Sequence, residues 1–87
     1  MSKRYVEVVV SRSKSVMDYT LEVITLLNQG MDEVKIKGVG REISKAVDVY
    51  NSVKDRLGDG VDLVNTEIGT EKGKKTSYIV ITVARKY

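Results

Sequence analysis

Residues 35–48, KIKGVGREISKAVD, constrain the fold more than any other part of the chain. Polar and apolar residues alternate over residues 33–37, which predicts a β-strand. A Gly-Val-Gly turn is predicted at residues 38–40. From Ile43 to Leu57, apolar residues recur at spacings of three and four, which predicts an amphipathic helix. Because glycines between a strand and a helix let backbone N–H groups approach an anion, this junction is also a candidate phosphate site.

The first third of the chain predicts one strand and one helix. Residues 5–10, YVEVVV, are rich in β-branched residues and almost continuously apolar, so we expect a strand that is buried on both faces. Ser15 and Asp18 have a spacing like that of a capping box and mark the expected start of a helix. Its broad apolar face is predicted to include Met17 and Leu21, and a glycine at position 30 is expected just past its end.

Two further strands are predicted at residues 61–68 and 77–84. The alternation of the first of these slips between Leu63 and Val64, which indicates a bulge or a twist. The resulting order is β-α-β-α-β-β, in which the crossovers favour parallel pairing of the early strands and the final hairpin is antiparallel. We therefore predict one domain over residues 1–87, an α+β two-layer sandwich with a mixed four-stranded sheet and both helices on one face.

The last predicted strand has apolar residues on both of its faces. Ile79 and Ile81 can face the helices, and Tyr78 and Val80 then point to the uncovered face of the sheet. An apolar stripe on an open face indicates a partner surface, and two-fold homodimers are the commonest oligomers. We therefore expect a homodimer interface at Tyr78 and Val80.

The composition excludes several kinds of chemistry. The chain contains no His and no Cys, so it lacks the commonest general base, a thiolate nucleophile and the usual zinc ligands. No apolar stretch of the sequence is long enough to span a bilayer. Lys and Arg outnumber Asp and Glu by 15 to 12. We expect a cytoplasmic binding protein rather than an enzyme, with no cofactor, no metal and no membrane association.

The residues alone leave three readings of the Gly-Val-Gly turn open. A dinucleotide-binding fingerprint requires a third glycine where Ile43 stands, which disfavours a nucleotide cofactor. The turn can be a tight connection with no further role. Its N–H groups can also meet a nucleic-acid phosphate. Lys37, Arg41 and Lys45 surround the turn and favour the third reading.

Two other basic segments are either solvated loops or nucleic-acid contacts. SRSKS, residues 11–15, precedes the first helix, and we expect it to leave the same edge of the sheet as the Gly-Val-Gly turn. EKGKK, residues 71–75, suits a flexible arm at the tip of the hairpin. The predicted nucleic-acid-binding residues are Arg12, Lys14, Lys37, Gly40, Arg41, Lys45, Lys72, Lys74 and Lys75.

Two stretches of sequence are distinctive, VMDYTLEVITLLNQG at residues 16–30 and VKIKGVGREISKAVDV at residues 34–49. Together with the order of elements, they closely resemble the Alba family of archaeal chromatin proteins, and the likeness covers essentially the whole chain. The resemblance implies the fold of the C-terminal domain of bacterial translation initiation factor three, a homodimer, and binding of DNA and RNA. It also implies duplex contacts through the two loops, with a hairpin arm from each subunit along the minor groove.

The chain departs from the family pattern at several positions. Ser13 stands at the first position of a typical Lys-Lys pair, the position linked to control by acetylation. Val39 replaces an arginine, and Leu57 replaces a Phe that mediates contact between dimers in many members. We expect a dimeric, nucleoid-associated architectural protein for double-stranded DNA that also binds RNA, with Leu57 at the dimer–dimer contact. The alternative is an RNA-binding protein of ribonucleoprotein assembly, and pairing with a paralogue stays open.

Overall fold

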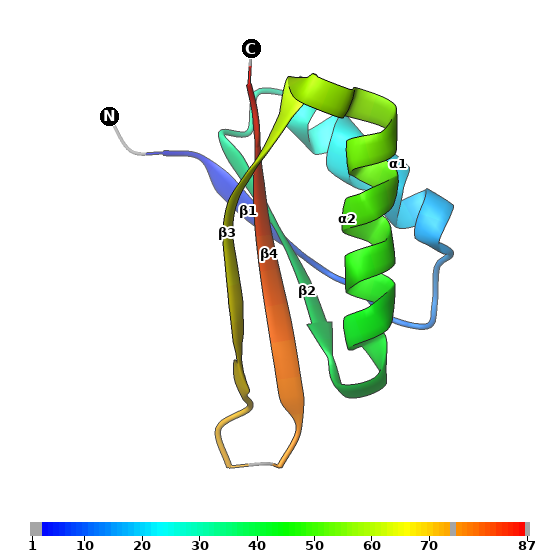
Figure 1. Ribbon diagram of the computed structural model, residues 1–87, viewed down its shortest axis with the longest axis vertical. Coiled ribbons are helices and arrows are strands. Elements are labelled where there is room, and N and C mark those ends of the chain that lie inside the picture. Colours follow the sequence, from blue (N-terminus) through cyan, green and yellow to red (C-terminus); the bar gives the residue numbers. More distant parts are fainter. Residues whose placement is uncertain (1–2, 74, 87) are drawn as a thin grey trace.

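The computed structural model, which describes residues 3–73 and 75–86, has two layers (Figure 1). Four strands form one sheet, and two helices cover one of its faces. The elements are β1 (Tyr5–Val9), α1 (Val16–Asn28), β2 (Glu33–Val39), α2 (Ile43–Leu57), β3 (Val61–Thr70) and β4 (Ser77–Arg85), with short 3₁₀ turns at Gly40–Glu42 and Gly58–Gly60. The predicted α+β sandwich and its order of elements are confirmed.

The strands lie in the order β1-β2-β4-β3. β1 is parallel to β2, and β4 is antiparallel to both β2 and β3. Because β1 and β2 are parallel neighbours, the loops that follow them leave the sheet at the same edge, as predicted. β1 and β3 are the two edge strands of the sheet.

The core lies between the sheet and the helices. Alternate residues of β2 are buried, as the pattern of the sequence predicted. In β4 the predicted residues Ile79, Ile81 and Val83 are buried, together with Thr82. The fully buried core side chains include Val23, Leu27, Val34, Ile36, Ala46, Val49, Val53 and Val83. Ser15 and Asp18 form the predicted capping box at the start of α1, and Gly30 has a positive φ of 97° just past its end.

Two predictions of burial are wrong. β1 is buried on one face only: Tyr5 is 62% exposed and Val9 is 53% exposed, because β1 is an edge strand and no element covers the other side of the sheet. Met17 and Leu21 of α1 are also largely exposed, since α2 and the sheet cover a narrower face of this helix than expected.

The turn predicted at residues 38–40 lies at residues 40–42 in the structure. Gly38 and Val39 continue β2, and the chain turns at Gly40, whose φ is +59°. A Cβ at Gly38 would overlap the carbonyl oxygen of Glu42 and would lie 2.8 Å from the Cβ of Ala46. Glycine at position 38 therefore lets the start of α2 pack directly on the end of β2.

The predicted irregularity in β3 is confirmed. The pairing register of β3 with β4 shifts between Leu63 and Asn65, which leaves Val64 as the extra residue of a bulge. β3 also contributes the largest group of exposed apolar side chains from one element: Leu63, Val64 and Ile68.

We predict that Gly38→Ala lowers the free energy of unfolding by about 1–3 kcal/mol, because the added methyl group has no space beside α2. Gly60→Ala is the matched control, since a Cβ there meets no atom closer than 4.0 Å. The control should change stability by less than about 0.5 kcal/mol. Chemical denaturation of the two variants checks this, and equal stabilities would show that the close packing at position 38 is not required.

Candidate nucleic-acid interface

Three connecting segments follow one another along one side of the molecule: in Figure 1 the hairpin tip is at its lower end, the connection between β2 and α2 lies above it, and the connection between β1 and α1 lies higher still, beside α2. They are the first loop, residues 10–15 between β1 and α1, the second loop, residues 40–42 between β2 and α2, and the hairpin tip, residues 71–76 between β3 and β4. A Cβ at Gly40 would lie 3.2 Å from the side chain of Thr76, so the second loop touches the base of the hairpin tip. The fold thus brings together the three basic segments that the sequence singled out.

The first loop is held by the buried side chain of Tyr19. The Tyr19 hydroxyl accepts a hydrogen bond of 2.9 Å from the backbone N–H of Ser11 and lies 2.9 Å from the Ser11 hydroxyl. The Ser11 hydroxyl lies in turn 2.7 Å from that of Ser13. The pKa of Tyr19 is lowered, chiefly because the Ser11 side chain hydrogen-bonds to its oxygen. Tyr19 was not predicted from the sequence to belong to this site. The only indication in the sequence is its position on the buried face of α1.

Lys14 is paired within the chain. Its Nζ lies 2.9 Å from Oε1 of Glu22, and the hydrogen bond and the attraction of this carboxylate raise the pKa of Lys14 above its ordinary value of 10.5. Arg12, two residues earlier, is exposed and forms no ion pair with any residue in the described part of the chain.

The three cationic residues around the second loop have different environments. Arg41 is exposed and, within residues 3–73 and 75–86, forms no ion pair. Lys37 lies on the open face of the sheet, where its Nζ is 3.4 Å from Glu71 and 5.3 Å from the centre of the Tyr78 ring. Lys45 points to the first loop. Only Arg41 therefore presents its charge at the second loop without an intramolecular partner among the described side chains.

Lys45 joins the two loops. Its Nζ donates a hydrogen bond of 2.7 Å to the backbone carbonyl of Ser11 and another to the backbone carbonyl of Lys14. It also lies 5.6 Å from the centre of the Tyr19 ring. The charge of Lys45 is thus directed at the protein backbone.

The two helix starts at this end differ in their capping. The Ser15 side chain accepts a hydrogen bond from the N–H of Asp18, and the Asp18 carboxylate faces the first turn of α1. Among the described residues, no side chain caps the start of α2, and its first turn contains no acidic residue. The N–H of Ile43, the first residue of α2, donates to the carbonyl of Gly40, and the acidic residue Glu42 stands at the N-cap position. The start of α2 is therefore not a free anion site, and the positive charge here comes from Arg41.

The hairpin tip carries exposed cations. Lys72 and Lys75 are exposed, whereas Lys74, also predicted to bind nucleic acid, lies outside the described residues. The backbone N–H of Glu71 donates to the carbonyl of Thr76 at 2.7 Å and closes the tip, in which Gly73 has a φ of +79°. The tip therefore presents positive charge beside the second loop.

On the open face of the sheet, acidic side chains outnumber basic ones along the strands, in contrast to the cationic end. The strand pairing and the alternation of side chains place Glu7, Glu33, Asp62 and Glu67 on this face, together with Lys35 and Lys37. More carboxylates than ammonium groups of the strands therefore lie on this face, where Lys3, which precedes β1, pairs with Glu33. The positive charge is concentrated at the end with the loops.

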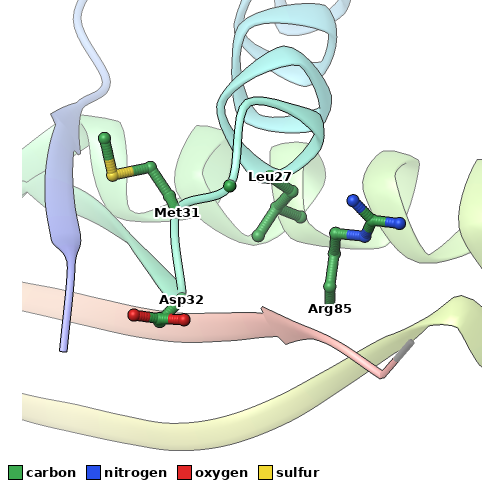
Figure 2. A pocket seen from close by; sticks show the side chains of 5 residues that line it. Leu27, Met31, Asp32 and Arg85 are labelled. Carbon is green, nitrogen blue, oxygen red and sulfur yellow. The ribbon is translucent and has the colours of Figure 1, made fainter. Parts of the chain in front are cut away.

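A pocket of 280 Å³ lies at the other end of the molecule, beyond the end of α1 (Figure 2). Leu27, Gly30, Met31, Asp32 and Arg85 line it. Asp32 already accepts a hydrogen bond of 2.8 Å from the backbone N–H of Arg4. The pocket is separate from the cationic end.

Within the described residues, no group of three or more acidic side chains is placed to hold a metal ion. No helix among these residues is long and apolar enough to cross a membrane.

The fold and the three basic segments define a small α+β domain with a cationic end built from two strand-to-helix loops and a hairpin. The chain belongs to the Alba family, whose family model matches residues 6–70. It is 55% identical to DNA/RNA-binding protein Alba 2 of Saccharolobus shibatae and 56% identical to that of Saccharolobus solfataricus, with both chains of each pair fully covered.

Solved structures agree with this assignment. Alba from Thermoplasma volcanium matches with a TM-score of 0.81 and 30% identity, over 91% of this chain and 99% of that one. ALBA1 from Trypanosoma brucei shares the fold, with a TM-score of 0.83 at 23% identity, over 91% of this chain and 68% of that one.

We predict that Glu22→Gln lowers the pKa of Lys14, because the carboxylate that raises it is lost. The pair stabilises the fold below pH 10.5, and its contribution is lost as the pH rises through the raised pKa of Lys14. Both side chains are well exposed, so the change in stability at neutral pH should be small. An NMR titration of the lysine side chains measures the shift. Glu33→Gln, which removes the partner of Lys3, is the control and should leave Lys14 unchanged.

Proposed function

We propose that this chain is a dimeric architectural protein of the chromosome that binds double-stranded DNA, and also RNA, through its cationic end. The observation that carries the proposal is the placement of Arg12 and Arg41. These exposed residues come from the first and second loops, which lie next to each other because Lys45, in the first turn of α2, donates to two carbonyls of the first loop. Neither arginine forms an ion pair within the described residues.

Phosphates are the groups that this arrangement suits best. Arginine guanidinium groups bind phosphate oxygens, and contacts of this kind position a protein on the backbone without reading sequence. The names of the two Saccharolobus relatives, which include DNA and RNA, support both targets. If each subunit neutralises about three phosphates, the slope of log K against log salt for duplex DNA is roughly −5.

The hairpin suits an arm that follows a groove. β3 and β4 are 10 and 9 residues long, and the tip carries Lys72 and Lys75 without large apolar side chains. We propose that this arm lies in the minor groove, where lysine side chains can reach the phosphates on either side. Competition between duplex DNA and structured RNA of equal length, at one salt concentration, separates an architectural DNA protein from a component of ribonucleoprotein assemblies.

We propose that the dimer interface lies on β3. The sequence predicted it on the open face of the sheet, at Tyr78 and Val80. Both of those side chains are half-buried within one subunit, and the Tyr78 ring covers Gly69, where a Cβ would lie 2.7 Å from its hydroxyl oxygen. Ile68, in contrast, is 73% exposed, and Leu63 and Val64 are about half exposed on the same edge strand. We propose that a second copy of the chain covers this strand, which also satisfies an unpaired sheet edge.

Leu57 keeps its proposed role at the contact between dimers, with a smaller apolar area than a Phe offers. It lies at the last residue of α2, is half-buried and packs against the core, so that only part of its surface is available to another dimer. We therefore propose that dimers coat DNA less cooperatively than in relatives that carry the aromatic residue.

We predict that Arg41→Ala weakens duplex binding roughly tenfold and to a similar extent on unrelated sequences, since a phosphate contact is lost. The salt slope should become shallower by about one unit for each subunit. Lys35→Ala removes the same charge from the open face and should change affinity much less. Fluorescence anisotropy at several salt concentrations provides both quantities. An Arg41 variant that binds as tightly as the unmodified protein, or a Lys35 variant that is equally impaired, contradicts the proposed interface.

We predict that Ile68→Asp converts the dimer to monomers, because it places a carboxylate without a partner in an apolar contact. Val80→Asp is the comparison, at the surface predicted from sequence. If β3 forms the interface, the Val80 variant stays dimeric; if the open face does, the outcomes are reversed. Light scattering gives the mass of each variant, and circular dichroism verifies that each retains its fold.

A further inference from the structure

We infer that Lys45 is a positioning residue that fastens the first loop to α2, and not one of the residues that contact nucleic-acid phosphates. The inference rests on the proposed function and refines it, because it assigns different roles to cations that lie at the same end of the molecule. It was not apparent from the sequence, which placed Lys45 among the phosphate contacts.

The contacts of Lys45 carry the inference. Its Nζ donates to the carbonyl oxygens of Ser11 and Lys14, which stand near the two ends of the first loop. Two of the three N–H donors of the ammonium group are therefore directed at the backbone. The Tyr19 ring lies 5.6 Å away and faces the same cation. Since the group is half-buried, moving it to a phosphate would leave these two carbonyl groups without their donor.

The consequence for the loop is a fixed shape. Tyr19 holds the start of the loop through the N–H and the hydroxyl of Ser11, and Lys45 closes the loop across its two ends. Arg12 lies between these attachment points, and Lys14 is one of them. Holding the loop before binding reduces the ordering cost of presenting both cations to a phosphate backbone.

The experiment compares Lys45→Met with Lys54→Met. Lys54 is a matched control because its Nζ also donates to two backbone carbonyls, those of Gly58 and Val61, beyond the other end of α2. The probe is a mixed-sequence DNA duplex, titrated at several salt concentrations. Hydrogen exchange of the Ser11 and Ser13 amides, followed by NMR in the protein without DNA, reports on the loop itself.

We expect Lys45→Met to weaken binding roughly tenfold with an unchanged salt slope, because the phosphate contacts are misplaced and not removed. The Ser11 and Ser13 amides should exchange several-fold faster while core amides are unaffected. In a Lys14→Ala background, the same substitution should cost less, since one of the groups that it positions is already absent. Lys54→Met should alter neither the affinity nor the exchange of the first loop.

Lys45→Arg distinguishes a positioning role from a phosphate contact. Arginine binds phosphate at least as well as lysine, but its longer planar head does not reproduce the two carbonyl contacts. We expect Lys45→Arg to bind DNA more weakly and to exchange its first-loop amides faster, although the charge is retained. If Lys45→Met does not fold, the arginine variant alone still tests the positioning role.

Two results overturn the inference: an Arg variant with the affinity and loop exchange of the unmodified protein, or a Met variant that flattens the salt slope by about one unit per subunit without loosening the loop. Failure of the unmodified protein to bind DNA or RNA would instead reject the proposed function. The exchange measurements would still show whether Lys45 fastens the loop.

Discussion

The close contact between Gly38 and the start of α2 sets the geometry on which the cationic end depends. Without a side chain at this position, the carbonyl of Glu42 and the side chain of Ala46 lie directly against the last residues of β2. The helix therefore begins right at the sheet edge, with only the turn at residues 40–42 between them. That placement puts Arg41 on the outer side of the turn, and it brings Lys45, one helical turn later, within reach of the first loop.

Topology, rather than net charge, concentrates the positive charge. A formal charge of +3 is small for a protein proposed to bind a polyanion. Parallel pairing of β1 and β2 places both strand-to-helix loops at one edge, and the β3–β4 hairpin meets the second loop, where a Cβ at Gly40 would lie 3.2 Å from Thr76. Carboxylates lie instead along the open face of the sheet. The resulting asymmetry orients the molecule towards an anion, which a uniform distribution of the same charges would not do.

The sequence predicted the backbone well because its periodicities are strong. The alternation in β2 and the three-and-four spacing in α2 identified the elements, and the slip at Leu63 and Val64 identified the bulge. The exposure of β1 was not predictable in the same way. A run of valines has the same composition whether its second face meets a helix or solvent, and the placement of both helices on one side of the sheet decides which. Likewise, the sequence placed Lys45 near the second loop but could not show its direction, since its acceptors are backbone carbonyls 31 and 34 residues away.

The same physical chemistry explains why charged residues at this end divide into two groups. Lys14, Lys37 and Lys45 each have an internal acceptor, whereas Arg12 and Arg41 have no ion-pair partner among the described residues. A lysine ammonium is compact and strongly hydrated, so a carboxylate or carbonyl in a fixed position can hold it and order the loop around it. A guanidinium group is planar and less strongly hydrated, and it matches the spacing of two phosphate oxygens. In a domain of 87 residues with little core to spare, Lys45 thus fixes the first loop, while Arg12 and Arg41, like the exposed Lys72 and Lys75 of the hairpin tip, form no ion pair among the described residues.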